Sequence, residues 1–452
     1  MNKKSLINSD LVIIGAGPIG LTLSIFLKRL GYQPIIYEKR TKSEVLNNLY
    51  HRSVNITLSH RGLVTLKSIG CDVQVINKGH KIIGRNYILS KNLNHFTPYT
   101  RIKDKYLVSI KRQHLLQALL QKASEMGVLF KFGYELKQVN FESNTLSFKN
   151  RKIELNKHFQ FLYGCDGINS VVSPQLLEGN VTMTSHSYGY KKIDITKNEA
   201  EEMNFCANCL NILSQEDFMF LSLPNKDGSH SGLIHADKKW LKLERNLSEI
   251  NELFEDSILG IISDIDLQFR KNKIGQFESV NCKVWHNSNT LILGDAAHGM
   301  VPFYGQGTNT GFENVSIYAD LLKSNNYDFA KTAKNFHKKR KLDVQTISRM
   351  SEGNIQKLFL TKEDIAEYVV RNNLESKIEY EFENYFSEYY NVAFTNKSFS
   401  YINEISKIQN RILKKEVWNI RNYGKSIIDS NYRSRIYNKI EKEISKKEIE
   451  KL

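Results

Sequence analysis

The sequence predicts an α/β protein in which a Rossmann-like domain is interrupted by a mixed β-sheet domain and followed by a helical C-terminal cap. Three observations lead to this prediction. A glycine loop directly follows a short apolar run near the N-terminus. Two further glycine-marked segments occur far along the chain, around residues 164 and 294. Residues 327–452 contain no proline and show helical periodicity.

The first glycine segment is Gly15-Ala-Gly17-Pro18-Ile19-Gly20, and it follows the apolar run of residues 11–14. Such a run is typical of a buried parallel strand. Gly15 permits a tight turn, Gly17 lets backbone amides approach a pyrophosphate, and Gly20 lets the helix expected over residues 19–30 pack closely on the sheet. The N-terminus of that helix favours an anion. We therefore expect a dinucleotide at this loop, contacted by Pro18 and Ile19 as well.

An acidic residue follows the second expected strand, over residues 34–37. Glu38 stands at its C-terminal end, where a carboxylate accepts hydrogen bonds from ribose hydroxyls and repels a 2′-phosphate. The nucleotide held by this loop should therefore be FAD or NAD and not NADP.

The third glycine segment decides between FAD and NAD. A strand expected over residues 290–293 ends at Gly294-Asp295, where the acid can reach ribityl or ribose hydroxyls, although a plain helix N-cap explains Asp295 equally well. The run Gly305-Gln306-Gly307-Thr308-Asn309 then opens a helix, and its amides can face the pyrimidine edge of a flavin. This late glycine-rich helix start predicts FAD.

These segments resemble the single-component, FAD-dependent aromatic hydroxylases, the fold group of para-hydroxybenzoate hydroxylase, and within that group the kynurenine 3-monooxygenases. The resemblance lies in residues 52–62, 106–112, 164–170, 221–225 and 294–313, and it fades beyond about residue 360. It implies a Rossmann-like FAD domain of the glutathione-reductase type.

The resemblance implies roles for residues along the whole FAD domain. Glu38 and Arg40 match ribose and phosphate contacts, Arg112 matches an arginine near the flavin phosphates, and Asp295 matches the ribityl-binding acid. Asp166-Gly167 matches a motif assigned to FAD and to visiting NADPH, with a tight turn as the alternative. Thr57, Leu136, Thr308 and Asn309 are further cofactor contacts that the resemblance implies. The catalytic residues that it implies, at the reactive ring of the flavin, are Pro302, Tyr304, Gly305, Gln306 and Gly307.

The resemblance also implies a substrate site for an aromatic amino acid. Arg85 would bind the carboxylate bidentately and Tyr99 would add a phenol donor, with Asn354 and Tyr389 completing the set. Tyr390 is the alternative to Tyr389, and a solvated surface position is the alternative for Arg85. Tyr304 stands where relatives usually have Phe or His, and residues 204–215 have no clear counterpart. A kynurenine-like substrate other than kynurenine therefore stays open.

The implied chemistry is hydroxylation of an activated ring. NADPH would visit to reduce FAD, and O₂ would give a C4a-hydroperoxide that hydroxylates L-kynurenine ortho to its aryl amine. The aryl amine already activates that position, so no strong protein base is needed, and His298 is expected to pack behind the Gly294 loop. The alternatives are hydroxylation of another tryptophan-derived or phenolic metabolite, and a non-catalytic flavin-binding sensor.

The net charge and the cysteine content limit the partners and the compartment that we expect for this protein. The net charge of +16 is spread along the chain, which argues against nucleic acid, and five cysteines fit a reducing cytoplasm. The lone Cys206-x-x-Cys209 pair is interpreted as incidental, with no metal site. No stretch approaches a membrane helix. Residues 405–452 hold 13 Lys or Arg against 6 Asp or Glu, and their isoleucine stripe would dock on the protein or rest weakly on a membrane surface.

The three cofactor segments lie far apart, so the FAD domain is expected to be discontinuous, over residues 1–75, 103–175 and 280–325. Residues 76–102 and 176–279 would form the substrate sheet, and residues 326–452 the helical cap. The oligomeric state, monomer or homodimer, stays open.

Overall fold

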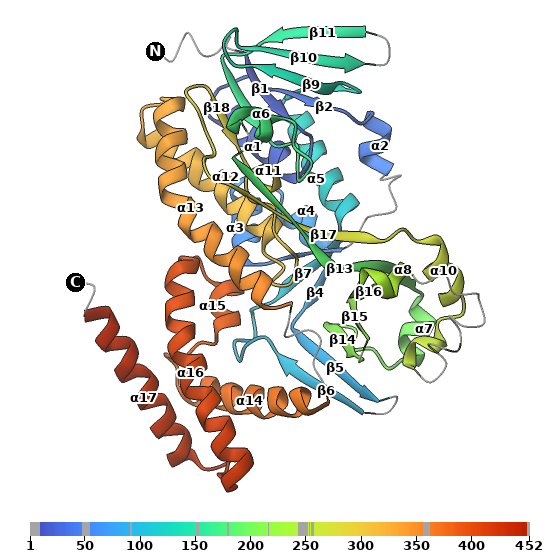
Figure 1. Ribbon diagram of the computed structural model, residues 1–452, viewed down its shortest axis with the longest axis vertical. Coiled ribbons are helices and arrows are strands. Elements are labelled where there is room, and N and C mark those ends of the chain that lie inside the picture. Colours follow the sequence, from blue (N-terminus) through green and yellow to red (C-terminus); the bar gives the residue numbers. More distant parts are fainter. Residues whose placement is uncertain are drawn as a thin grey trace.

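The computed structural model describes residues 10–47, 55–90, 93–150, 153–178, 180–215, 217–242, 252, 254, 257–355 and 362–449 (Figure 1). The molecule is elongated in this view. The sheet β9–β11 lies at one end, and the helices α14, α16 and α17 lie at the other.

A five-stranded parallel sheet is the base of the N-terminal half, in the order β18–β12–β1–β2–β8. Its strands are β1 (Leu11–Ile14), β2 (Ile35–Glu38), β8 (Leu129–Phe132), β12 (Phe161–Gly164) and β18 (Thr290–Ile292). Each residue of β1, β12 and β18 is buried, as expected for apolar runs covered on both faces. Because the carboxyl ends of parallel strands meet at one edge, this sheet brings the three glycine segments together.

Helices and two small sheets surround this base. The longer helices are α1 (Pro18–Arg29), α5 (Arg112–Glu125), α12 (Gly307–Ser324) and α13 (Phe329–Gly353). The shorter ones are α2 (Lys42–Asn47), α3 (His60–Ser68), α4 (Asp72–Lys78), α6 (Val172–Leu177) and α11 (Asp295–His298). One antiparallel sheet contains β9 (Glu135–Asn140), β10 (Thr145–Asn150) and β11 (Ile153–His158). The other has the order β3–β7–β4, with β3 (Asn55–Leu58), β4 (His80–Ile82) and β7 (Leu107–Lys111).

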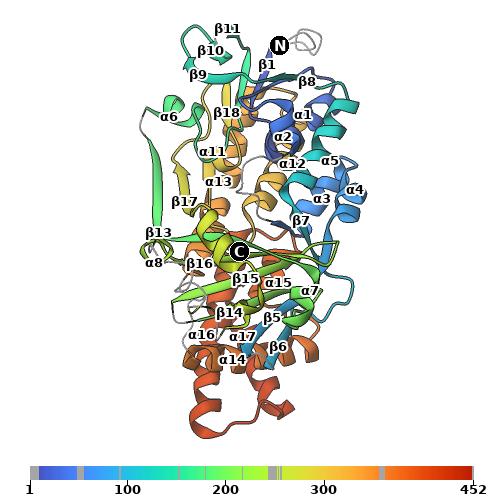
Figure 2. The same cartoon turned by 90° about the vertical axis from the view of Figure 1, so that its right-hand side faces the viewer.

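A separate seven-stranded mixed sheet has the order β17–β13–β16–β15–β14–β5–β6 (Figure 2). Its strands are β5 (Gly84–Ser90), β6 (Leu93–Pro98), β13 (Val181–Ile195), β14 (Cys209–Ser214), β15 (Phe218–Pro224), β16 (His230–Asp237) and β17 (Gly275–Cys282). One face packs on a core supplied by α7 (Lys197–Glu202), α8 (Lys238–Lys242), η1 (Ile258–Ile261) and α10 (Ile265–Lys271). Phe220 and Ile234 belong to this core.

The C-terminal part is helical, as the proline-free sequence predicts. It contains α14 (Lys362–Glu381), α15 (Glu388–Phe394), α16 (Phe399–Tyr423) and α17 (Ser430–Ile449). The isoleucine stripe of α17 docks on the protein, because Ile436 and Ile440 are buried in a core shared with α14 and α16. Within the described residues, no helix is both long and apolar enough to cross a membrane.

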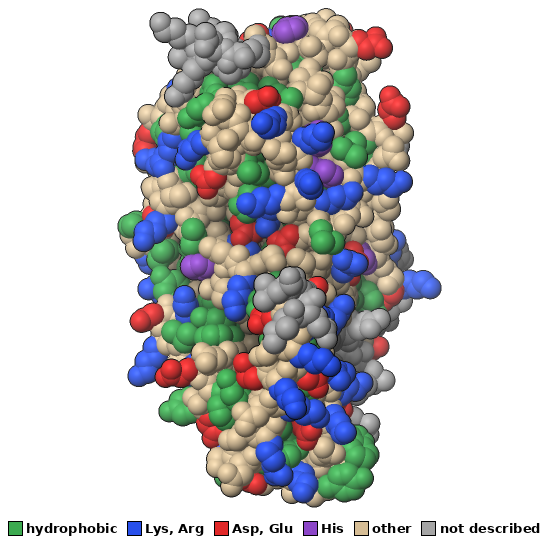
Figure 3. All heavy atoms as spheres, turned by 90° about the vertical axis from the view of Figure 1, so that its left-hand side faces the viewer, with side chains coloured by type: hydrophobic (Ala, Val, Ile, Leu, Met, Phe, Trp, Pro, Cys, Tyr) green, Lys and Arg blue, Asp and Glu red, His purple; other side chains and the backbone are tan. Residues whose placement is uncertain are grey.

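Two findings bear on charge and cysteines. On the face that Figure 3 shows, Lys and Arg side chains are scattered and do not gather into one patch.

The interpretation of Cys206 and Cys209 as incidental is wrong for this structure, because a disulfide joins them. The turn before β14 brings their Cα atoms to 5.3 Å, within the range that a disulfide spans. The spacing alone did not show that this local turn brings the two thiols together.

Candidate functional site

The first glycine loop has the geometry of a phosphate cradle. Gly15 has a φ of +103°, and a Cβ there would lie 2.4 Å from the carbonyl oxygen of Cys165. A Cβ on Gly20 would lie 2.1 Å from the carbonyl oxygen of Gly15. A Cβ on Gly17 would meet nothing within 4 Å, so the loop is open at the N-terminus of α1. That helix begins at Pro18 without a side-chain cap, which leaves its first free amides to an anion.

Glu38 lies against this loop. Its Oε2 accepts a hydrogen bond from the amide of Ala16 at 2.8 Å, and its Oε1 accepts one from Nε of Arg40 at 2.8 Å. Burial would raise the pKa of Glu38, but the hydrogen bonds and the charge of Arg40 lower it. Glu38 is therefore a carboxylate held at the end of β2, beside the predicted pyrophosphate position. Leu136, also predicted at the cofactor, is a buried residue of β9.

Two acidic residues follow the neighbouring strands β12 and β18. The Oδ2 of Asp166 accepts hydrogen bonds from the amides of Val171 and Val172 at 2.7 and 3.2 Å, and its buried Oδ1 has no partner. Desolvation by the protein atoms around it raises the pKa of Asp295, and the charge of Arg112 opposes that rise. In the part of the chain that the structure describes, no ion pair involves Asp295. The side chain of Asp295 is accessible to solvent, which leaves its carboxylate available to ligand hydroxyls.

The loop before α12 is held rigidly next to β3. Gly305 has a φ of +65°, and a Cβ there would lie 2.8 Å from Oγ1 of Thr57. The buried Asn309 donates through Nδ2 to the carbonyls of Thr57 and Gly305 at 2.9 and 2.7 Å, and its Oδ1 accepts from the amide of Ser59 at 2.9 Å. Asn309 therefore acts as a structural tie inside the predicted flavin-ring loop, and its side chain is not free for a ligand.

The other predicted residues of this loop differ in exposure. Pro302 is exposed, Gly307 and Thr308 are half-buried, and Gln306 is buried with its Oε1 accepting from Oγ of Ser59 at 3.4 Å. The hydroxyl of Tyr304 donates to Glu388 of α15. That hydroxyl is therefore engaged within the protein and does not serve as a free proton donor.

A buried charge network fixes α12, the helix that follows the loop. Nη1 of Arg61 lies 2.5 Å from Oε1 of Glu313, and Nη2 of Arg340 lies 2.6 Å from Oε2 of the same residue. Arg340 also pairs with Asp343 at 2.7 Å and donates to Oδ1 of Asn314 at 2.7 Å. The network joins α3, α12 and α13. Asn314 in turn bonds the buried His298 at 3.0 Å, so His298 packs behind the Gly294 loop as expected.

Arg85 lies in a cage of aromatic rings. Its guanidinium carbon is 4.1 Å from the ring centre of Tyr389 and 5.6 Å from that of Tyr99. The rings of Tyr99 and Tyr389 stack at 5.0 Å. Tyr390 instead packs against Phe386 and Phe394, so Tyr389 is the tyrosine that faces Arg85. Residues 99 and 389 thus meet although 290 positions separate them.

The flavin-ring loop lies close to this cage. The rings of Tyr304 and Tyr389 stack at 6.3 Å. Asn354, at the end of α13, donates to the carbonyl of Phe303 at 3.4 Å. The four predicted substrate residues and the predicted flavin-ring loop are therefore neighbours. Residues 52–54, part of one segment that carried the resemblance, lie outside the described residues.

Sequence reasoning missed three residues that share this region. Tyr368 of α14 accepts from Nη1 of Arg85 at 3.3 Å, and its hydroxyl is 2.7 Å from that of Tyr87. Burial would raise the pKa of Tyr368, but the charge of Arg85 and hydrogen bonds from Tyr87 and Asn372 lower it. The signal for Tyr87 was its position two residues after Arg85 on one strand. No local pattern marked Tyr368.

The third missed residue is His235 of β16. Its side chain is 2 % exposed, and neither ring nitrogen has a hydrogen-bond partner. The rings of Phe277 and Phe303 lie 5.4 and 5.8 Å from it. Burial lowers the pKa of His235 to about 3, so the imidazole is neutral at physiological pH. A polar side chain in an otherwise apolar strand pattern was the available signal.

Comparison with known proteins agrees with this geometry. The family model described as "FAD binding domain" matches residues 8–324. Kynurenine 3-monooxygenase of Legionella pneumophila (strain Corby) is 27% identical over 420 residues, covering 89% of this chain and 92% of that protein. The enzyme of the same name from Anopheles gambiae is 26% identical over 432 residues, covering 92% of this chain and 87% of that protein.

Solved structures share the fold at low identity. The tetrameric form of 2-methyl-3-hydroxypyridine-5-carboxylic acid oxygenase aligns with a TM-score of 0.65 at 17% identity, covering 77% of this chain and 92% of that one. PqsL of P. aeruginosa in complex with 2-aminobenzoylacetate aligns with a TM-score of 0.64 at 16% identity, covering 78% and 96%. The predicted fold, an interrupted FAD domain with a mixed sheet and a helical C-terminus, is confirmed.

Proposed function

The chain belongs to the FAD binding domain family and is an FAD-dependent monooxygenase, and from this premise we propose that it hydroxylates the ring of an aromatic amino acid. The proposed substrate is L-kynurenine or a close analogue, hydroxylated ortho to the aryl amine. NADPH would be the electron donor and O₂ the co-substrate. The roles given above to individual residues of the cofactor and substrate sites are part of this proposal.

The observation that supports the substrate class is the environment of Arg85. Four phenols, those of Tyr87, Tyr99, Tyr368 and Tyr389, surround its guanidinium. Within the described ranges no Asp or Glu pairs with it, whereas the buried Arg61 and Arg340 each have a carboxylate partner. An enclosed guanidinium without an anion is costly, and its planar fork matches a carboxylate. The α-carboxylate of an amino acid would complete this site.

The register of the seven-stranded sheet supports a ring position at the other end of the site. One row of paired residues crosses β5, β14, β15 and β16: Tyr87, Ile212, Leu221 and Leu233. Side chains two positions apart on a strand share a face, so Arg85 and His235 lie on the same face as this row. Three strand spacings separate β5 from β16, about 14 Å, and His235 lies four residues further along the strands than the row of Arg85, about another 13 Å. The two backbone positions are therefore about 19 Å apart. Side chains that reach inward from both ends leave a span that suits an extended aromatic amino acid.

His235 would then meet the ring end of the substrate. A neutral imidazole offers one donor and one acceptor. Both are buried among aromatic rings beside Phe303, which belongs to the predicted flavin-ring loop. A polar ring substituent of the substrate, such as the aryl amine, would satisfy one of them. Recognition would thus combine a carboxylate clamp at Arg85 with a hydrogen bond at His235.

The residues around the cofactor position fit FAD. The Gly15–Gly20 loop offers a cradle that a Cβ would fill, Glu38 and Asp295 offer carboxylates, and Gly305 keeps the α12 loop close to β3. When bound, FAD would accept electrons from NADPH and activate O₂. The protein binds and orients the substrate and excludes water with the Tyr304 and Tyr389 stack.

The test compares L-kynurenine with kynuramine, which lacks the carboxylate. The wild-type FAD-loaded protein should oxidise NADPH faster with kynurenine and give a ring-hydroxylated product. Arg85→Ala should raise KM for kynurenine at least about a hundredfold and leave KM for kynuramine nearly unchanged, because only the carboxylate contact is lost. Arg270→Ala, on the far helix α10, is the matched control. Equal use of both compounds by the wild type would refute the amino-acid assignment.

A further inference from the structure

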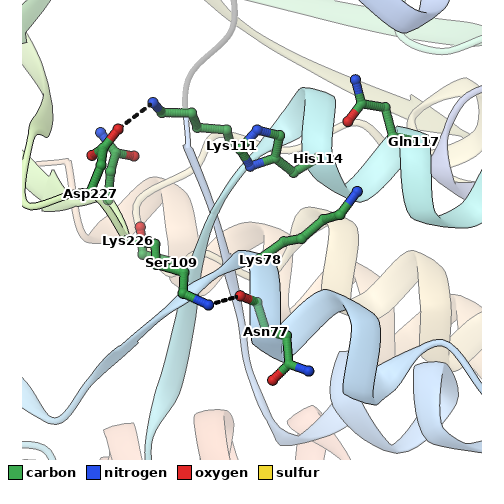
Figure 4. Close-up of a pocket in the computed structure, with 9 residues that line it drawn as sticks. Asn77, Lys78, Ser109, Lys111, His114, Gln117, Lys226 and Asp227 are labelled. Carbon is green, nitrogen blue, oxygen red and sulfur yellow. Dashed lines mark hydrogen bonds and ion pairs between the residues drawn. The ribbon is translucent and has the colours of Figure 1, made fainter.

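A cationic cavity of about 450 Å³ lies beside the predicted flavin site (Figure 4). The end of α4, the end of β7, the start of α5 and the β15–β16 turn enclose it. Three lysines from three of these elements line it, Lys78, Lys111 and Lys226, against one carboxylate, that of Asp227. Such an excess of positive charge in a concave site favours an anionic ligand.

The lysines differ in how far protein groups neutralise them. Nζ of Lys111 lies 3.6 Å from Oδ2 of Asp227, in a pair that is largely exposed. Nζ of Lys226 donates to the backbone carbonyl of Asn77 and not to a carboxylate. Lys78 has no ion pair within the described ranges. Two of the three charges therefore lack a counter-charge from the protein.

The start of α5 also lines the cavity. Burial together with the charges of Lys111 and Lys78 lowers the pKa of His114, whose ring is hydrogen-bonded to the backbone of Lys78. The helix α5 begins at Arg112 without a side-chain cap, so no side chain occupies the first amides of the helix end that lines the cavity. Lysine charges and the free amides of a helix start are groups that bind phosphate.

Strands β3 and β7 connect the cavity to the flavin-ring loop. Ser109, which lines the cavity, pairs with Thr57 across the β3–β7 ladder. A Cβ on Gly305 would meet the side chain of Thr57. Asn55, two positions from Thr57, bonds both Ser109 and Asn225 of the cavity wall, at 3.0 and 2.9 Å. A group bound in the cavity is therefore close to the position predicted for the flavin ring.

We propose that this cavity binds the pyrophosphate of the nicotinamide dinucleotide that reduces the flavin, an inference that rests on the proposed function. The Gly15–Gly20 loop would already hold the FAD pyrophosphate, so a second dinucleotide requires its own anion site. In such a dinucleotide one ribose joins the nicotinamide to the pyrophosphate. A pyrophosphate in the cavity would thus leave the nicotinamide within reach of the flavin ring.

The test measures binding without turnover. Dissociation constants of NADP⁺, NAD⁺ and nicotinamide mononucleotide are determined for the FAD-loaded full-length protein by calorimetry, with the dissociation constant of FAD measured in parallel. Lys78→Ala and Lys226→Ala should each weaken NADP⁺ and NAD⁺ about tenfold, by loss of one charge-assisted contact, and leave FAD affinity unchanged. At least one of the two should also weaken the mononucleotide, which carries only the phosphate on the nicotinamide side. Lys78→Arg should restore most of the affinity. Lys149→Ala, on the exposed surface of β10, controls for the loss of one general charge.

Three outcomes would overturn the assignment. If the lysine variants lose FAD, the cavity holds the flavin phosphates. If they weaken NADP⁺ alone, it holds the 2′-phosphate. If no affinity changes, it holds neither. A wild-type protein that binds the mononucleotide as expected but oxidises no NADPH with any aromatic amino acid refutes the proposed function and leaves the cavity assignment supported.

Discussion

Replacing His235 by Phe is expected to stabilise the ligand-free protein while impairing substrate recognition. Both ring nitrogens of His235 are buried without partners. Each unsatisfied buried polar group costs about 1–3 kcal/mol. Phenylalanine removes both groups and suits the aromatic surroundings of Phe277 and Phe303, although its extra volume costs about 1–3 kcal/mol. The net expectation is a gain of about 1–3 kcal/mol in the free energy of unfolding.

A histidine on the same strand provides the control. His230 is equally buried, but its Nδ1 is hydrogen-bonded to Oγ of Ser222 at 2.8 Å. His230→Phe leaves that hydroxyl unpaired and should lower the free energy of unfolding. Urea denaturation of both variants, followed by circular dichroism, measures the contrast. Equal destabilisation by the two substitutions would refute the claim that His235 lacks a partner.

The burial of His235 also predicts that the free energy of unfolding depends on pH. The folded protein keeps His235 neutral down to about pH 3, whereas the unfolded chain protonates it near its ordinary pKa of 6.5. The unfolded state therefore binds more protons as the pH falls below about 6.5, and stability is lost in that direction. Between pH 6.5 and 5 this single group costs about 2 kcal/mol. The stability advantage of His235→Phe over the wild type should grow by that amount, and a difference independent of pH would contradict the reasoning.

Two further predictions concern the support of the cofactor loop. Glu313→Gln should lower the free energy of unfolding by about 3–5 kcal/mol, because it leaves the buried guanidinium groups of Arg61 and Arg340 without their shared carboxylate. A loss below about 1 kcal/mol in urea denaturation would show that the network is not a stabilising unit. Gly305→Ala should weaken FAD binding about tenfold, because it combines a positive φ with a Cβ placed 2.8 Å from Thr57. Gly353→Ala, where a Cβ meets nothing within 4 Å, should leave the dissociation constant of FAD unchanged in the same fluorescence titration.

Local sequence patterns predicted the parts of the fold in which one segment determines its own structure. The apolar run before Gly15 predicted a buried strand, and the glycine spacing predicted the turn and the helix that follow. The late run at Gly305 likewise predicted a helix start, observed at Gly307. These predictions succeeded because glycine loops and buried strands depend on steric and hydrophobic constraints within about ten residues. The residue roles assigned through resemblance, and the domain boundaries, stay predictions.

The sequence by itself therefore determined the class of fold and the glycine loop that we propose to hold FAD, and the resemblance supplied the candidate arginine of the substrate site. Only the tertiary structure decided which side chains face one another. Strand register places His235 on the same face as Arg85, and the packing of α14 brings Tyr368 to Arg85 across 283 positions. The placement of α15 puts Tyr389, and not Tyr390, against Arg85. The physical reason is that long-range contacts follow from how complete elements pack together, and no residue's immediate neighbours encode that packing.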